Sequence, residues 1–284
     1  MSAPRLELTE AVESFVPSGA AIYLGNFGAQ LFAVGHQLLR SGRNDLHVIM
    51  GSGGILLDQL IGAGAVREAT FAHCWSPVGP APAWAFRREL EGDGDIILHE
   101  LSLGMLVAAL MAGAWDVPFM PVPDAAGTGY ADADWTGGMY SRATAPFGTT
   151  AVVSALQPDV AFVHVDAVTP NGHGLLRTPR AEMAVAAQAS RRTVLVAEEL
   201  VDEAAARAEP SRVAVPGLLT EAYVVTPGAV HPDGLVGRYQ RDVPRYASYA
   251  EAARTTDGLR SWLDEWVYGV DDHAAYRRKL GEQP

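Results

Sequence analysis

Short, continuously apolar segments alternate with amphipathic helical patterns along the chain, and this alternation restricts the fold more than any other feature. Strands are predicted at residues 20–24, 46–50, 67–72, 95–99, 118–121, 159–165 and 192–197. Helical patterns lie between most of them, at residues 30–41, 55–63, 80–91, 101–114 and 179–190. Strands that are apolar throughout and separated by helices are typical of a mainly parallel sheet covered on both faces. We therefore predict an α/β fold with its ligand site at the carboxyl ends of the strands.

The last part of the chain, residues 248–281, is predicted to be helical because apolar residues recur there at helical spacing. The members of this stripe are Tyr249, Ala253, Leu259, Trp262, Leu263, Trp266 and Val267. A length of 284 residues, 49% of them hydrophobic, allows either one large core or two modest ones. We expect a single domain over residues 1–284, with residues 248–281 as its helical C-terminal region.

Charge and cysteine content exclude several classes of protein. A formal net charge of −12 argues against a nucleic-acid partner, because no basic patch is available to neutralise phosphates. The single cysteine, Cys74, excludes a disulfide framework within the chain and is typical of a reducing compartment. The most apolar run, residues 101–115, is too short to span a bilayer, and no signal peptide precedes the first strand. We expect a cytoplasmic protein without a membrane partner.

Two glycine-rich turns follow predicted strands and precede predicted helices. The first contains Gly25, Asn26, Phe27 and Gly28, and the second spans residues 51–54, with glycines at 51, 53 and 54. Free amide groups at the start of a helix suit an anionic or carbonyl oxygen. Neither turn has the lysine of a P-loop or the G-x-G-x-x-G spacing of dinucleotide-binding folds. The alternative is that both are only tight turns between a strand and a helix.

Acidic residues also fall at the ends of predicted strands. Glu100 lies where the strand at 95–99 passes into a helix, and Ser102 is a candidate N-cap for that helix. A glutamate among apolar neighbours has a raised pKa and can act as a general base or nucleophile, although an ordinary loop carboxylate is the alternative. Glu198 and Glu199 are expected at a helix N-terminus, where they would favour its dipole.

Histidine and cysteine positions do not predict a metal site. His73 and Cys74 are adjacent, so their side chains point in different directions, and no second pair at ligand spacing accompanies them. The segment 123–148 is long, glycine-rich and without periodicity, which suggests a functional loop or a partner surface. Its larger side chains are Tyr130, Trp135, Met139, Tyr140 and Phe147. They are expected either at an interface or folded back on their own sheet.

An ordered series of motifs covers nearly the whole chain, from residue 19 to about residue 267. The series includes SALQPDVAFVHVDAVTPNGHG, AAQASRRTVLVAEELV, VPGLLTEAYVVTPGAVHPDGLVGRYQRD and YAEAARTTDGLRSWLDEWV. It resembles the alpha subunit of family I CoA-transferases, most closely the branch of the glutaconate CoA-transferase A subunit. The resemblance implies a three-layer α/β/α fold with a parallel-rich sheet, of the CoA-transferase/NagB-RpiA-like kind. It also implies a beta subunit of the same fold, in a heterodimer or heterotetramer, and coenzyme A or acyl-CoA as substrate with no tightly bound cofactor.

The resemblance also assigns candidate site residues. An alpha-subunit strand of this family ends in a Gly-Gly-Phe turn on the CoA side of the cleft, and the turn at 25–28 stands in its place, with Asn26 as a candidate oxyanion donor. The candidate CoA-binding residues are Gly25, Phe27, Gly28, Gly51, Gly53 and Gly54. The Ser-Glu-(Asn or Gly)-Gly motif, which carries the nucleophilic glutamate of the transferases and belongs to their beta subunit, does not occur in this chain.

Glu100 resembles the glutamate that a steroid-degrading branch of the family uses for hydrolytic ring opening of an acyl-CoA. Three interpretations therefore remain: a CoA-transferase subunit, a ring-opening hydrolase subunit that uses Glu100, and a non-catalytic scaffold or binding subunit. His99 alternates to the other face of its strand and is expected to be structural.

Overall fold

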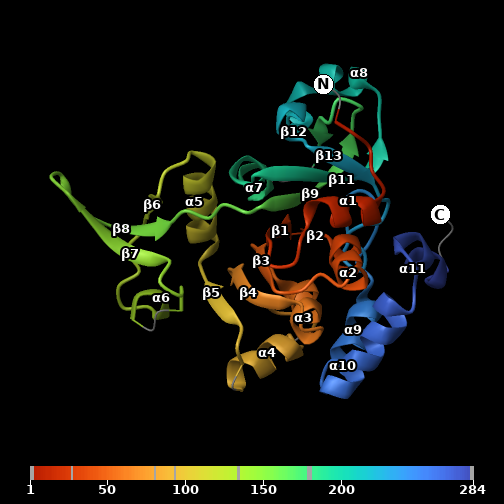
Figure 1. Cartoon of the computed structure of the whole chain (residues 1–284), viewed down its shortest axis with the longest axis horizontal. Coiled ribbons are helices and arrows are strands. Elements are labelled where there is room, and N and C mark those ends of the chain that lie inside the picture. The colour runs from red at the N-terminus through yellow and green to blue at the C-terminus, as the bar shows by residue number, and fades with distance from the viewer. Residues whose placement is uncertain are drawn as a thin grey trace.

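The computed structural model describes residues 3–26, 28–79, 81–92, 94–132, 135–177 and 181–281, and their arrangement is that of an α/β protein (Figure 1). The strands are β1 (Ala21–Asn26), β2 (Ala29–Gln30), β3 (Leu46–Met50), β4 (Val66–Phe71), β5 (Ile97–Glu100), β6 (Phe119–Val122), β7 (Tyr140–Ala145), β8 (Gly148–Ser154), β9 (Val160–Val168), β10 (Gly174–Leu175), β11 (Arg192–Leu200), β12 (Val213–Val215) and β13 (Ala222–Val225). The α-helices are α1 (Leu8–Phe15), α2 (Phe32–Arg40), α3 (Gly54–Gly62), α4 (Trp84–Glu91), α5 (Leu103–Ala114), α6 (Gly129–Asp132), α7 (Met183–Ala189), α8 (Glu203–Ala208), α9 (Val243–Ala252), α10 (Thr256–Leu263) and α11 (His273–Lys279).

The main sheet is parallel over most of its width, as predicted. The pairing runs in the order β13, β11, β9, β1, β3, β4, β5, and each of these neighbouring pairs is parallel. The short strands β2, β10 and β12 add antiparallel pairings at the margins. Every predicted strand of this sheet begins within two residues of an observed one, and β9 and β11 continue three residues further than predicted. Strand β5 begins later than predicted and continues through residue 100, so that Glu100 is the last residue of the strand.

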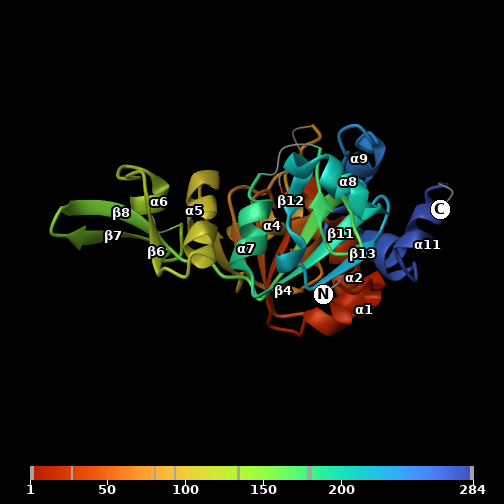
Figure 2. The same cartoon turned by 90° about the horizontal axis from the view of Figure 1, so that it is seen from above.

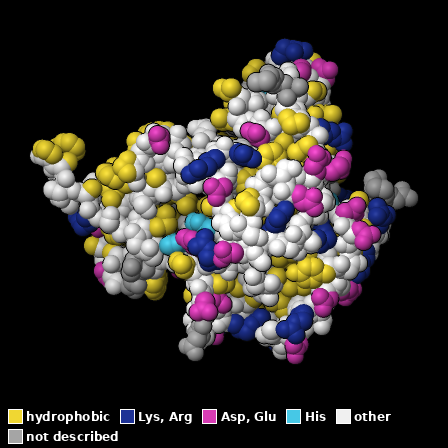
Figure 3. Space-filling model, viewed as in Figure 1, with side chains coloured by type: hydrophobic (Ala, Val, Ile, Leu, Met, Phe, Trp, Pro, Cys, Tyr) yellow, Lys and Arg dark blue, Asp and Glu magenta, His cyan; other side chains and the backbone are white. Residues whose placement is uncertain are grey.

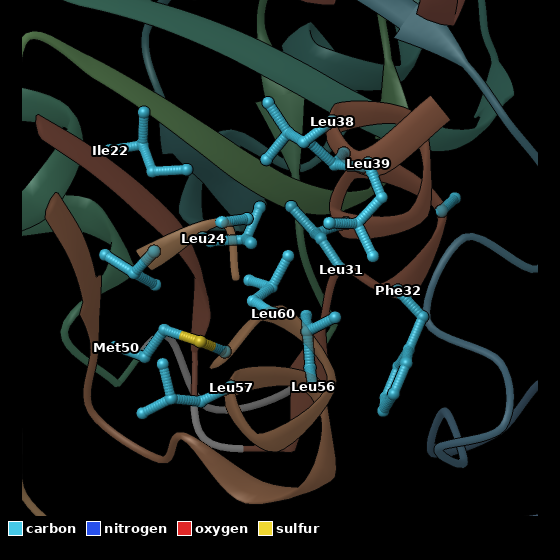
Figure 4. Close-up of a cluster of buried hydrophobic side chains, with 14 of the residues drawn as sticks. Ile22, Leu24, Leu31, Phe32, Leu38, Leu39, Met50, Leu56, Leu57 and Leu60 are labelled. Atoms are coloured by element: carbon cyan, nitrogen blue, oxygen red, sulfur yellow. The ribbon is translucent and has the colours of Figure 1, made fainter. Parts of the chain in front are cut away.

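Helices cover both faces of the sheet and give three layers. One core lies beneath α1, α2, α3, α4, α9 and α10, and a second core lies beneath α5 and α7 on the opposite face. Strand β1 contributes to both because its side chains alternate: Ile22 and Leu24 face the first core, and Tyr23 faces the second. Figure 4 shows Ile22 and Leu24 of this strand packed with leucines of α2 and α3. Full burial of one such side chain contributes roughly 1.5–3 kcal/mol to folding.

Residues 119–154, here called the arm, form a separate small sheet. Strands β6, β8 and β7 pair antiparallel in that order, and α6 lies between β6 and β7. Figure 2 shows the arm extending away from the main sheet beyond α5. The segment 123–148 is therefore not an irregular loop, because β7 and the start of β8 form a hairpin within it. Sequence periodicity did not reveal this hairpin because β7 and the first three residues of β8 are mostly polar and exposed.

The larger side chains of the arm were expected either at an interface or folded back on their own sheet, and the structure shows both arrangements. Tyr130, Met139 and Tyr140 are partly buried against the second core. Trp135 and Phe147 keep 54% and 95% of their surface exposed. Figure 3 shows hydrophobic side chains gathered along the arm. Part of the segment thus folds back on its own protein, and part of it presents aromatic surface to the outside.

The C-terminal region is helical, as predicted, and it packs on the first core. Helices α9 and α10 are followed by a π-helical turn, η3 (Asp264–Tyr268), and by α11. Of the predicted apolar stripe only Trp266 is less than fully buried. Asp58 of α3 joins this region to the body: its carboxylate accepts hydrogen bonds from Tyr249 Oη (2.6 Å) and from the amide of Phe86 (2.7 Å). Among the described residues, no helix has both the length and the apolar composition needed to cross a bilayer.

Candidate functional site

The turns that follow β1, β3 and β5 lie on the same edge of the sheet, as the sequence predicted. All three strands are parallel members of one sheet, so their carboxyl ends meet at one edge. From β1 the chain continues through β3, β4 and β5 on one side of the sheet, and from β9 it continues through β11 and β13 on the other. The strand order therefore reverses between β1 and β9. Such a reversal of strand order opens a crevice at the carboxyl edge, where α/β proteins bind ligands. With neighbouring strands about 4.8 Å apart, Glu100 lies about 10 Å from the turn after β3 and about 14 Å from the turn after β1.

Main-chain contacts with β2 determine the shape of the first glycine turn. Strand β2 folds back on β1, with Gly25 opposite Gln30 and Asn26 opposite Ala29. Gly25 has a φ of 81°, and a Cβ there would lie 2.6 Å from the carbonyl oxygen of Ala29. Gly28 has a φ of 85°, but the space where its Cβ would stand is open. The fold itself requires glycine at 25, whereas the open side of Gly28 leaves room for a ligand.

Two of the predicted residues of this turn are only partly covered by the structure. Phe27 lies outside the described residues. Asn26 is the last residue of β1, and its side chain is likewise outside the description. The roles assigned to these two side chains therefore stay predictions.

Gln30 links the first glycine turn to the second. Its Nε2 donates a hydrogen bond to the carbonyl oxygen of Ser52 (2.9 Å), and a Cβ on Gly54 would collide with its amide group. Gly54 has a φ of 51°, which also favours glycine. The amide of Gly53 donates to the carbonyl oxygen of His73 (2.9 Å), so this amide is already used within the chain. Sequence reasoning missed Gln30, because a glutamine after a glycine turn carries no distinctive signal.

Glu182 is a second residue that the sequence did not reveal. Its carboxylate, from the residue that precedes α7, lies against Gly51, and a Cβ on Gly51 would collide with it. Only 3% of Glu182 is exposed. Burial raises the pKa of the Tyr23 hydroxyl far above its usual value, and the nearby Glu182 carboxylate raises it further. A buried carboxylate therefore borders the turn after β3, although well over a hundred residues of sequence separate the two segments.

Glu100 occupies the end of β5 next to the arm. Its side chain is half-buried, and this burial raises its pKa. Its amide donates to the carbonyl oxygen of Trp135 in the arm (2.8 Å). Ser102 caps α5 as predicted, since its Oγ accepts from the amide of Met105 (3.1 Å). A carboxyl group with a raised pKa at the carboxyl edge has the properties required of a general base or a nucleophile.

Glu198 and Glu199 do not lie at a helix N-terminus, and the prediction of a helix-dipole role was wrong. Both belong to β11, and α8 begins later, where Asp202 caps it. Glu198 is buried and accepts hydrogen bonds from the amide of Gly228 (2.8 Å) and from Tyr239 Oη (3.0 Å), with His164 Nε2 at 3.3 Å. Burial raises the pKa of Glu198, but these partners outweigh it and the net pKa is lowered. Glu198 thus anchors the loop after β13 rather than a helix.

Several other features bear on what this edge can bind. Among the described residues, no group of three histidine, cysteine or acidic side chains is arranged to hold a metal ion. The Sγ of Cys74 donates to the carbonyl oxygen of Gly54 (3.4 Å), and burial raises the pKa of its thiol. Five surface hollows of about 420–620 Å³ lie elsewhere on the described part of the chain, and none of the described residues in the three turns lines them.

Comparison with known proteins identifies the family of the chain that carries this site. A family model described as Coenzyme A transferase matches residues 5–226, which is most of the chain. The chain belongs to the coenzyme A transferase family. Enzymes of this family act on CoA thioesters. The resemblance to family I CoA-transferase alpha subunits, inferred from the motifs, is thereby confirmed.

The relatives align with the chain over nearly its whole length. The A subunit of glutaconate CoA-transferase from Acidaminococcus fermentans is 27% identical, over 97% of this chain and 91% of the relative. The A subunit of 3-oxoadipate CoA-transferase from Pseudomonas knackmussii is 29% identical, over 98% of both chains. The cholesterol ring-cleaving hydrolase IpdA subunit of Mycobacterium tuberculosis is 28% identical, also over 98% of both.

The fold agrees equally well with a solved member of this family. The crystal structure of glutaconate coenzyme A-transferase from Acidaminococcus fermentans matches with a TM-score of 0.91 at 26% identity, covering 98% of this chain and 93% of that chain. The predicted three-layer α/β/α architecture, with its parallel-rich sheet and helical C-terminus, is confirmed.

Proposed function

We propose that this chain is the alpha subunit of a heteromeric CoA-transferase that moves CoA between carboxylic acids together with a beta subunit of the same fold. The observation that carries the proposal is the full-length match to chains named as the A subunits of CoA-transferases. CoA or an acyl-CoA is the substrate, with no tightly bound cofactor. The single cysteine, Cys74, favours the cytoplasm as the site of this activity.

The proposed site lies at the carboxyl edge of the sheet. The turns at 25–28 and 51–54 contact the CoA thioester through main-chain amides, and Asn26 donates a hydrogen bond to the oxyanion that develops during acyl transfer. Because the motif of the nucleophilic glutamate is absent from this chain, the nucleophile of a transferase comes from the beta subunit. Asn26→Ala should then lower turnover by about a hundredfold or more.

The beta subunit covers part of the arm in this proposal. Trp135, at 54% exposure, and Phe147, at 95% exposure, present aromatic surface of the kind found at interface cores. The assembly is a heterodimer or a pair of heterodimers. Two results together would contradict this part of the proposal: the isolated chain elutes as a well-behaved monomer, and it does not bind a beta subunit when the two are co-expressed.

A trapping experiment tests the transferase directly. A family I transferase forms a glutamyl-CoA thioester, which hydroxylamine or borohydride converts to a stable product. The assembled enzyme is incubated with acyl-CoA and either reagent, and both of its chains are then analysed by mass spectrometry. Modification of a beta-subunit glutamate is expected. Turnover of an acyl-CoA without any trapped glutamate would exclude the transferase.

A ring-opening acyl-CoA hydrolase is the second candidate, and Glu100 is the observation that favours it. Its carboxyl group lies at the carboxyl edge and has a raised pKa because of burial, as a general base requires. Relatives from Mycobacterium tuberculosis and Rhodococcus jostii are named as ring-cleaving hydrolase subunits. In this alternative Glu100 activates the water that attacks the ring, and no thioester is trapped.

A non-catalytic scaffold remains the third interpretation, and substitution of Glu100 separates it from the others. Glu100→Ala with intact assembly and a large loss of activity excludes a silent subunit. Full activity of the same variant removes Glu100 from the mechanism and leaves the chemistry to the partner.

A further inference from the structure

Three ionisable side chains from neighbouring strands form a cluster on the sheet face beside the arm. They are His47 of β3, Glu68 of β4 and His99 of β5, with side-chain exposures of 13%, 20% and 10%. The register of the parallel strands places them side by side, since His47 is level with Glu68 and Thr70 is level with His99. Figure 3 shows histidine side chains at the surface where the arm meets the body.

The hydrogen bonds of His99 fix its protonation. Its Nδ1 lies 3.0 Å from the carbonyl oxygen of Thr136, and its Nε2 lies 2.8 Å from Oε1 of Glu68. A carbonyl oxygen only accepts hydrogen bonds, so Nδ1 must carry a proton. An ionised carboxylate also only accepts, so Nε2 must carry one as well. With Glu68 ionised, both ring nitrogens of His99 face acceptors, which is the hydrogen-bonding pattern of an imidazolium.

The surroundings keep Glu68 ionised. Burial raises its pKa, but the hydrogen bond from His99 and the positive charges around the carboxylate outweigh burial, and the net pKa is lowered. Arg67 Nη1 lies 3.2 Å from the second oxygen of this carboxylate, and Arg67 also pairs with Asp45 (3.3 Å). The carboxylate therefore has cationic partners on both of its oxygens.

His47 is the neutral member of the cluster. Burial lowers its pKa to about 4, and the charges of His99 and Arg67 act in the same direction against the attraction of Glu68. Its Nε2 lies 2.8 Å from Thr70 Oγ1, a hydroxyl that can donate or accept and so needs no charged imidazole. The ring centres of the two histidines are 6.1 Å apart. Nδ1 of His47 lies 3.8 Å from Glu68 Oε1, beyond hydrogen-bond distance, whereas both ring nitrogens of His99 lie within hydrogen-bond distance of an acceptor.

The bond from His99 holds the arm next to Glu100. Thr136 is fully buried, and the residue before it, Trp135, accepts the hydrogen bond from the amide of Glu100 (2.8 Å). Gly137, with a φ of 57°, packs directly on the imidazole of His99, where a Cβ would collide with the ring. Residues 135–137 therefore contact both the end of β5 and the charged histidine that precedes Glu100.

We infer that His99 is a positioning residue: an imidazolium, paired with Glu68, that fastens residues 135–137 of the arm to the sheet and thereby sets the position of Glu100. The charge on His99 makes the bond to Thr136 stronger than a neutral imidazole would, because charge-assisted hydrogen bonds are roughly twice as strong as neutral ones. The catalytic consequence rests on the second candidate function, in which Glu100 is the base, whereas the charge state and the attachment of the arm do not.

Nitrogen-15 NMR of the imidazole groups tests the charge state in the chain itself. At about pH 7 both ring nitrogens of His99 are expected to carry protons, whereas His47 shows one protonated and one unprotonated nitrogen. In Glu68→Gln the ionised acceptor is lost, and His99 should become a neutral tautomer that keeps its proton on Nδ1. An unprotonated ring nitrogen on His99 in the wild type would overturn the inference.

Hydrogen exchange tests the attachment of the arm. In His99→Gln, amides in peptides covering residues 97–103 and 135–140 should exchange at least about tenfold faster, because a charge-assisted bond is lost. The matched control is His47→Gln, which removes the neighbouring imidazole and should leave these peptides unchanged. Equal exchange in both variants would refute the attachment.

Kinetics of the assembled enzyme tests the effect on Glu100. His99→Gln should lower kcat about tenfold or more with little change in KM, and His47→Gln should not. In an enzyme that Glu100→Gln inactivates, an unchanged kcat in His99→Gln would contradict the positioning role. If the wild-type assembly turns over no acyl-CoA, the proposed function fails, and the NMR and exchange results still decide the inference about His99.

Discussion

His36 is an uncharged histidine enclosed between α2 and the C-terminal helices, and its burial predicts a loss of stability in acid. It is 2% exposed, and its ring makes edge contacts with Phe32 and Tyr276 at centroid distances of 6.0 and 5.8 Å. Its Nε2 donates to Gln59 Oε1 (2.9 Å). Burial lowers the pKa of His36 from 6.5 to about 3, although the bond to Gln59 opposes this change.

The sign and size of the effect follow from this difference in pKa. The unfolded chain binds a proton at this site below about pH 6.5, whereas the folded chain does not until about pH 3. The stability of the folded chain is therefore not reduced by this site above about pH 6.5, and the free energy of unfolding decreases as the pH falls from there toward 3. At about pH 5 the unfolded site is almost fully protonated and the folded site almost not at all. The resulting loss is about 2 kcal/mol from His36 alone.

Urea unfolding at about pH 8 and about pH 5 measures this contribution. His36→Gln keeps a donor for Gln59 and removes the titrating group, so its loss of stability between the two pH values should be smaller than that of the wild type by about 2 kcal/mol. Phe32→Leu is the control, because it disturbs the same packing and removes no titrating group. It should lower stability equally at both pH values. An identical pH-dependent loss in the wild type and His36→Gln would refute the reasoning.

Three further predictions concern the candidate site. Glu100→Gln in the assembled enzyme should lower kcat by about a hundredfold or more if this carboxylate acts as a general base. The exposed control, Glu91→Gln, should have no effect. Steady-state kinetics of both variants, with assembly checked by gel filtration, measures the difference. Gly51→Ala should destabilise the chain by about 1–3 kcal/mol in urea unfolding, because its methyl group enters the space of the Glu182 carboxylate; a variant as stable as the wild type would mean that Glu182 moves freely. The Cys74 thiol should resist iodoacetamide at neutral pH until the chain unfolds, because burial raises its pKa; rapid alkylation of the folded protein, seen by mass spectrometry, would contradict this.

Much of the fold was predictable because its signals are local. The parallel strands are apolar along their whole length, and the helices between them keep a clear period, so the order of elements follows from the sequence. The hairpin of the arm was not predictable in this way. Its strands contain residues such as Ser141, Arg142 and Thr144, which give no apolar alternation. Ala151 and Val153 of β8 pack in the second core, but the rest of the hairpin is mostly polar and exposed, so the pair has little hydrophobic pattern.

The same distinction between local and long-range signals separates the site residues that the sequence revealed from those it did not. Glu100 and the glycine turns were identified because they directly follow predicted strands, and the position of a strand end is a local property. Gln30, Glu182 and the cluster around Glu68 depend on contacts between segments far apart in sequence. No spacing rule within one element relates such residues. Glu198 was misplaced for the complementary reason, since β11 continues beyond the apolar part of its sequence.

The return of β2 over Gly25 has a consequence for how sequences of this kind diverge. Because the carbonyl of Ala29 occupies the space of a side chain at residue 25, any substitution there is removed by selection for folding, whatever the protein binds. Gly28 borders open space, but its φ of 85° also favours glycine, so a side chain there would strain the backbone without a clash. Asparagine tolerates this backbone conformation better than most residues. A descendant that has lost its chemistry would therefore accept asparagine at 28 more readily than any side chain at 25.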